Sequence, residues 1–71
     1  MENLVILSKQ NINDYQLTES FKNNVLTYDD ENLINMYSRF EFAINPDTNH
    51  LYSRHIVLGR VREWEEYTPN N

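Results

Sequence analysis

The chain has 71 residues, no cysteine and a formal net charge of −5. This length predicts a single compact domain over residues 1–71 without a linker. The lack of cysteine excludes disulfides, so we expect a cytoplasmic protein. The apolar run from Leu4 to Leu7 is far too short to span a membrane, and the negative charge disfavours nucleic acid as a ligand of the whole surface.

The first predicted elements are a short strand and a short helix. The stretch "LVILS", Leu4 to Ser8, is continuous and apolar, which is typical of a buried strand. The polar, asparagine-rich residues that follow predict a loop. Thr18 is a candidate N-cap for a helix of one or two turns, in which Phe21 and Val25 lie four residues apart.

A longer helix is predicted to begin at Thr27 or Asp29 and to continue to Phe40. Capping residues and three acidic residues open this stretch, where a negative charge suits the positive end of the helix dipole. The apolar residues recur at helical spacing and form one stripe. That stripe comprises Leu33, Met36, Tyr37 and Phe40.

The next stretch predicts a β-hairpin. "FEFAIN", residues 40–45, alternates apolar and polar residues with period two, and "NPDTN" then supplies turn-forming residues around Pro46. "HLYSRHIVL", residues 50–58, forms the returning strand. Two registers stay open: Phe42 lies opposite Ser53 in one and opposite Arg54 in the other, and a slip by one residue reverses the faces.

The segment "RVREWEEY", residues 60–67, has an ambiguous period. As a helix it would bring Trp64 into the core with Val57 and Val61. We favour an extended strand bent at Gly59, in which Trp64 shares one face with Arg60 and Arg62. Residues 68–71 are expected to fray.

These elements together predict a small α+β domain. One or two short helices would pack on a mainly antiparallel sheet of three to four strands. Because a chain of this size buries little apolar surface alone, homodimerisation is a further expectation.

The sequence offers little catalytic chemistry. His50 and His55 lie five residues apart on a predicted strand, so they face opposite sides and cannot readily share a metal. The acidic run Asp29–Glu31 lacks the spacing and the glycine of a calcium loop, and we interpret it as a helix start. A single glycine cannot build a phosphate-binding loop. We therefore expect neither an enzyme nor a cofactor or metal site.

The function that we predict is binding to a larger host protein through an acidic, nucleic-acid-like surface with aromatic anchors. Eleven asparagines against one glycine and one alanine indicate an AT-rich genome, and with the small size they suggest a phage or mobile-element product. Such a protein would inhibit or modulate a nucleic-acid-handling or defence protein. The predicted partner-binding residues are Asp29, Asp30, Glu31, Glu63, Trp64, Glu65, Glu66 and Tyr67.

Two alternatives remain open. The first is a single-stranded nucleic-acid-binding protein, in which cations and aromatic rings interleave on one sheet face to hold phosphates and stack bases. Its predicted binding residues are Tyr52, Arg54, Arg60, Arg62 and Trp64. The second is a structural subunit of a homo-oligomer or of a larger assembly.

Overall fold

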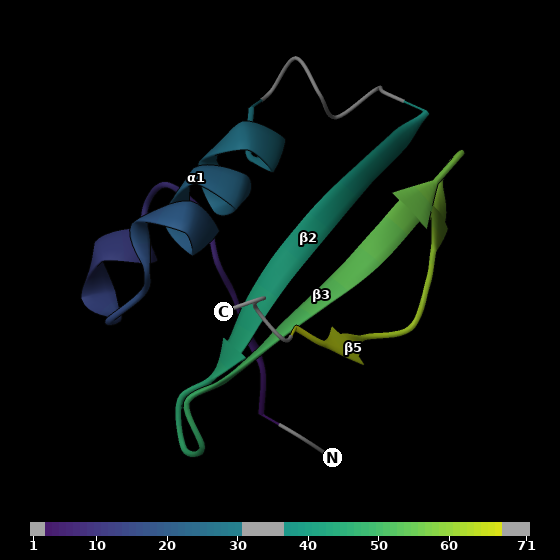
Figure 1. Cartoon of the computed structure of the whole chain (residues 1–71). Coiled ribbons are helices and arrows are strands. Elements are labelled where there is room, and N and C mark those ends of the chain that lie inside the picture. Colours follow the sequence, from purple (N-terminus) through teal and green to yellow (C-terminus); the bar gives the residue numbers. More distant parts are fainter. Residues whose placement is uncertain (1–2, 31–36, 68–71) are drawn as a thin grey trace.

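The computed structural model describes residues 3–30 and 37–67, and these ranges form one helix-on-sheet domain (Figure 1). The fold class predicted from the sequence, a small α+β domain with a mainly antiparallel sheet, is confirmed. The elements in chain order are β1 (Val5–Ile6), a 3₁₀ turn (Ile12–Asp14), α1 (Glu19–Tyr28), β2 (Ser38–Asn45), β3 (His50–Val57), β4 (Arg60–Val61) and β5 (Glu65–Glu66).

The β2–β3 hairpin is the centre of the sheet. The strand order is β1-β2-β3-β4, and β5 pairs with β3 as well, so that β4 and β5 follow one another along the same side of β3. Phe42 pairs with Ser53 and Ile44 with Leu51, which is the first of the two predicted registers. Asn45 Oδ1 closes the predicted turn by accepting a hydrogen bond from the Asp47 amide at 3.0 Å.

This register assigns each side chain to one of two faces, because directly paired residues of antiparallel strands point the same way. The face that carries α1, here called the helix face, holds Phe40, Phe42, Ile44, Leu51, Ser53, His55 and Val57. The opposite face, here called the far face, holds Arg39, Glu41, Ala43, Tyr52, Arg54 and Ile56. His50 and His55 therefore lie on opposite faces, as the sequence predicts.

The core lies between α1 and the helix face. It consists of the buried side chains Leu7, Ile12, Phe21, Val25, Phe42 and Ile44. The Phe21 ring meets the Phe42 ring edge-on at 5.3 Å between centroids, and it meets the Tyr67 ring at 5.0 Å. These contacts join α1, β2 and the residue that follows β5 into one aromatic cluster.

The helix that begins after Thr18 is longer than predicted. Thr18 caps it as expected, since its hydroxyl accepts a hydrogen bond from the Phe21 amide at 3.2 Å. Its ten residues exceed the predicted one or two turns because packing offsets the weak helix propensity of the two asparagines. Phe21 and Val25 are both buried, and the Asn24 side chain donates a hydrogen bond to the Tyr67 hydroxyl at 3.4 Å.

The longer predicted helix is wrong at both ends. Asp29 ends α1 as its C-cap, and residues 38–40 belong to β2; residues 31–36 lie outside the described part of the chain. The helix-start interpretation of Asp29 and Asp30 fails with it. Phe40 follows the period-two pattern because it packs in the strand against Phe42 and against the Tyr28 ring at 5.4 Å.

The segment after β3 is extended, as favoured from the sequence, but the chain reverses where a bend was expected. Leu58 and Gly59 have φ angles of 51° and 79°, which are the left-handed values of a two-residue hairpin turn. β4 therefore returns beside β3 and does not prolong it. The predicted fraying of residues 68–71 falls outside the described residues.

The aromatic cluster yields a stability prediction. Replacing Tyr67 with alanine removes the ring that holds the residue after β5 against α1, and we expect the free energy of unfolding to fall by about 2–4 kcal/mol. Tyr67→Phe keeps the ring and loses only the Asn24 hydrogen bond, so it should cost less than about 1 kcal/mol. Urea denaturation followed by tryptophan fluorescence measures both values. Equal losses for the two variants would contradict the cluster's role.

Candidate functional site

A β-bulge divides the charged segment 60–67 between the two faces. Val61 pairs with Ile56 and Glu65 pairs with Ser53, so four residue steps on this side match three steps on β3. One extra residue in a strand reverses the alternation of side chains beyond it. Arg60 lies opposite Val57 on the helix face, as does Arg62 by alternation, whereas Trp64 lies on the far face with Arg54. The predicted common face of Trp64 with the arginines is therefore wrong.

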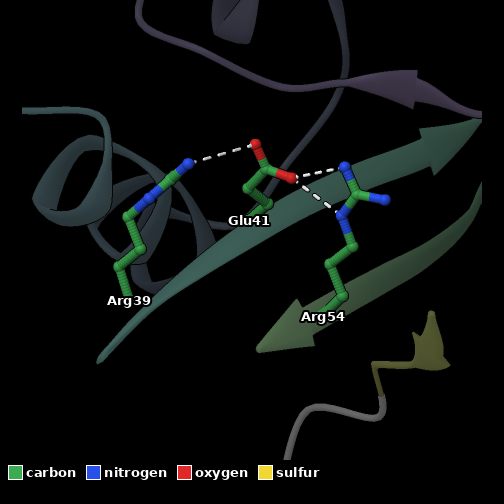
Figure 2. A network of polar contacts seen from close by, with 3 residues as sticks. All are labelled: Arg39, Glu41 and Arg54. Carbon is green, nitrogen blue, oxygen red and sulfur yellow. Dashed lines mark hydrogen bonds and ion pairs between the residues drawn. The ribbon is translucent and has the colours of Figure 1, made fainter. Parts of the chain in front are cut away.

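A row of interacting side chains crosses the far face (Figure 2). Glu41 Oε1 accepts hydrogen bonds from Arg54 at 2.7 Å from Nε and 2.6 Å from Nη2, and Glu41 Oε2 lies 3.7 Å from Arg39 Nη2. The Arg54 guanidinium also lies 4.3 Å from the centre of the Trp64 ring, a cation–π contact. The charge of Arg54 and one face of the Trp64 ring are therefore already engaged in contacts within the molecule.

This arrangement separates the residues that the nucleic-acid alternative requires on one face. Tyr52, Arg54 and Trp64 lie on the far face, where Tyr52 is buried and Arg54 is paired with Glu41. Arg60 and Arg62 lie on the helix face and are exposed. The structure therefore brings Arg60 and Arg62 together, but it places the predicted aromatic residues Tyr52 and Trp64 on the opposite face.

The predicted partner-binding residues are also distributed over separate places. The Asp29 carboxylate accepts a hydrogen bond from the Lys9 amide at 2.7 Å, beside the loop that follows β1. The glutamates of the 60–67 segment lie along the opposite edge of the sheet, on β5 and the bulge. Tyr67 belongs to the core cluster and Trp64 stacks on Arg54, so neither ring is a free anchor. Glu31 lies outside the described residues.

A groove of about 1060 Å³ lies mainly over the uncovered part of the helix face, and its lining also includes Arg54 and Val61, which occupy far-face positions. α1 packs over β2, and the groove lies over β3 and β4 beyond it. The residues that line it are Phe40, Ser53, Arg54, His55, Val57, Leu58, Arg60, Val61, Arg62, Glu63 and Glu65. The His55 ring stacks on the Phe40 ring at 4.5 Å with an angle of 9°, and His55 Nε2 shares a hydrogen bond with Ser38 Oγ. A flat aromatic pair is thus part of the groove wall.

Charged side chains of both signs border this groove. Arg60, Arg62, Glu63 and Glu65 are all exposed, and none of the four makes a salt bridge with another residue in the described ranges. By contrast, the neighbouring Glu66 lies 3.2 Å from His50 Nδ1. The groove therefore combines two uncompensated cations with two uncompensated anions.

Sequence reasoning missed the groove although it found most of its charges. The sequence places Phe40 both at the end of a helix stripe and at the start of a strand, and it offers His55 only as an unsuitable metal ligand, so the stacking of the two rings is not predicted. The signal that could have revealed the site is Gly59, the one glycine of the sequence, because glycine suits the second position of a two-residue hairpin turn and such a turn places β4 beside β3.

Metal binding finds no support in the described ranges, where no cluster of three histidine, aspartate or glutamate side chains is arranged to hold an ion. Ser38 and His55 form the pair closest to a nucleophile and base, but no carboxylate orients this histidine in the contacts of the described residues. In the same part of the chain, no helix combines the length and the apolar character needed to cross a membrane.

Comparisons of this chain with models of protein families, with curated proteins and with solved structures found no match.

The far-face row yields a second stability prediction. Glu41→Gln leaves two arginines without their carboxylate in a site that is about four-fifths buried, with side-chain exposures of 20–23%. We expect the free energy of unfolding to fall by about 1–3 kcal/mol, the range for hydrogen bonds to charged groups. Glu65→Gln, at an exposed position, should change it by less than about 0.5 kcal/mol. Thermal or urea unfolding would contradict the account if the two variants were equally stable.

Proposed function

We propose that this protein is a binding module without enzymatic activity, and that it recognises a segment of a partner protein in the groove beside β4. The observation that supports this proposal is the set of four exposed, uncompensated charges at the groove: Arg60, Arg62, Glu63 and Glu65. Charges that lack partners within a chain are free to select a binding partner by electrostatic complementarity.

The mixed sign of these charges favours a protein ligand. A polypeptide segment carries carboxylates for the arginines and ammonium or guanidinium groups for the glutamates. A nucleic acid carries phosphates only, and Glu63 and Glu65 would repel them.

A narrower form of this proposal comes from the sequence: an inhibitor or modulator of a host nucleic-acid-handling or defence protein, encoded by a phage or mobile element. Glu63, Glu65 and Glu66 support it as exposed anions along one edge of the sheet. Asp29 does not add to this surface, since its carboxylate lies beside the loop after β1. In this form of the proposal, the acidic contact comes from the edge glutamates.

One observation favours single-stranded nucleic acid as a second candidate ligand. The stacked rings of Phe40 and His55 lie in the groove together with Arg60 and Arg62, so a base could stack while its phosphate contacts an arginine. This ligand would use a different aromatic pair from the one predicted from the sequence.

Charge reversal separates the two candidates. For a protein ligand, Arg60→Glu/Arg62→Glu and Glu63→Lys/Glu65→Lys should each weaken binding about tenfold or more, because each pair contacts opposite charges on the partner. The measurement is quantitative capture from a lysate of the native host, followed by titration of the captured protein against each variant. Glu19→Lys on α1 is the control, since it changes charge away from the groove.

The same variants titrated with a labelled single-stranded oligonucleotide test the second candidate. Loss of binding in the arginine variant, combined with tighter binding in the glutamate variant, would replace the protein-binding proposal with nucleic-acid binding. Light scattering of the wild-type protein gives its mass in the same buffer. A stable oligomer that captures nothing would leave a structural subunit as the better account.

A further inference from the structure

Leu58 occupies a position where leucine is unfavourable for the fold in two independent ways. It is the first residue of the two-residue turn between β3 and β4, with φ at 51°. Side chains with a Cβ are strained in this left-handed region, and asparagine, aspartate and glycine are the residues that such turns prefer. At the other hairpin, the left-handed residue is Asn49, which follows this preference.

The Leu58 side chain is also largely exposed. Its exposed fraction is 69%, and two other apolar residues at this end of the sheet are exposed as well, Tyr37 at 81% and Val61 at 54%. The Leu58 amide donates a hydrogen bond to the Tyr37 carbonyl at 2.9 Å, which holds the backbones of these two residues side by side. Exposed apolar side chains at one end of a sheet are candidate contacts for a partner.

The charge at this end of the molecule is opposite to that of the whole chain. Residues 37–40 and 55–62 contain Arg39, Arg60 and Arg62 but no aspartate or glutamate, although the chain carries a net charge of −5. Arg39 is paired with Glu41 on the far face, and the two others are free at the groove. An apolar tip flanked by free arginines is complementary to apolar residues that are flanked by acids.

We infer that Leu58 is the apolar anchor of this interface, and that the bound segment is an extended stretch of a partner protein with an apolar residue beside acidic ones. The inference rests on the proposed function, and it adds the order in which apolar, acidic and basic residues follow one another along the bound segment. Its apolar and acidic residues contact Leu58 and the arginines, and its basic residues lie toward Glu63 and Glu65. Folding alone would favour asparagine or glycine at position 58. A requirement for partner binding explains why a strained, exposed leucine stands there.

An anionic membrane is the competing ligand for an apolar tip beside cations. The chain's charge of −5 opposes approach to anionic lipid, and each arginine contributes little against that total. Glu63 and Glu65 beside the arginines also fit a polypeptide better than a uniform layer of anionic headgroups.

The substitution Leu58→Asn tests the inference sharply, because it should stabilise the protein while weakening binding. It creates Asn-Gly, the preferred sequence for this turn, so the urea midpoint should rise. Selection of random displayed peptides on the wild-type protein supplies the probe. We expect the selected peptides to combine an apolar residue with acids at one end and basic residues at the other. They should bind Leu58→Asn about tenfold or more weakly.

Leu26→Gln is the matched control, because it removes a leucine that is 46% exposed on α1 and should leave peptide binding unchanged. If the selected peptides bound Leu58→Asn as tightly as wild type but lost binding to Arg60→Glu/Arg62→Glu, the anchor would be refuted and the groove proposal would stand. If no peptide were enriched over an empty support, both would fail. Co-sedimentation of the wild-type protein with phosphatidylserine vesicles, abolished by Leu58→Asn, would assign the tip to lipid and overturn the inference.

Discussion

The aromatic contact of Tyr67 with Phe21 and Phe42 is the constraint on which the arrangement of the chain depends. It ties the last described residue to α1 and to the central strand, in a molecule with few buried side chains. Because β4 is held by its pairing with β3 at one end and Tyr67 is held by the core at the other, the segment between them must fit a fixed span. It does so with one extra residue, and the resulting bulge decides which side chains reach each face.

The charges of segment 60–67 also have a purely structural explanation. β4 and β5 form an edge of the sheet, and natural proteins protect such edges with short strands, bulges and charged residues. All three features occur here, and they suffice to explain exposed glutamates. They do not explain Leu58, since an exposed, strained leucine at the turn neither protects an edge nor stabilises the fold. Leu58 is therefore stronger evidence for a binding role than the charges are.

The sequence predicts the central hairpin well because its apolar alternation and its turn residues agree with each other. It fails at residues 29–30 and 37–40. Tyr37 and Phe40 have the spacing of a helix, but Tyr37 is exposed ahead of β2, and the contacts of Phe40 with Tyr28 and Phe42 belong to the strand. For the candidate site, Arg60, Arg62, Glu63 and Glu65 were identified from the sequence. Their separation from Trp64 was not, since the extra residue accompanies the packing of Tyr67 against Phe21 and Phe42, which are far away in the sequence.

The proposed binding surface depends most on how the side chains of residues 60–67 divide between the two faces of the sheet. Proton NMR measures this division directly. Nuclear Overhauser contacts should connect the Trp64 ring to the Arg54 side chain, and the Tyr67 ring to Phe21, while the Arg60 side chain shows no contact with Trp64. Contacts from the Trp64 ring to Val57, which lies on the helix face, would instead indicate the helical alternative. They would contradict the bulge, the groove and the binding surface built on them.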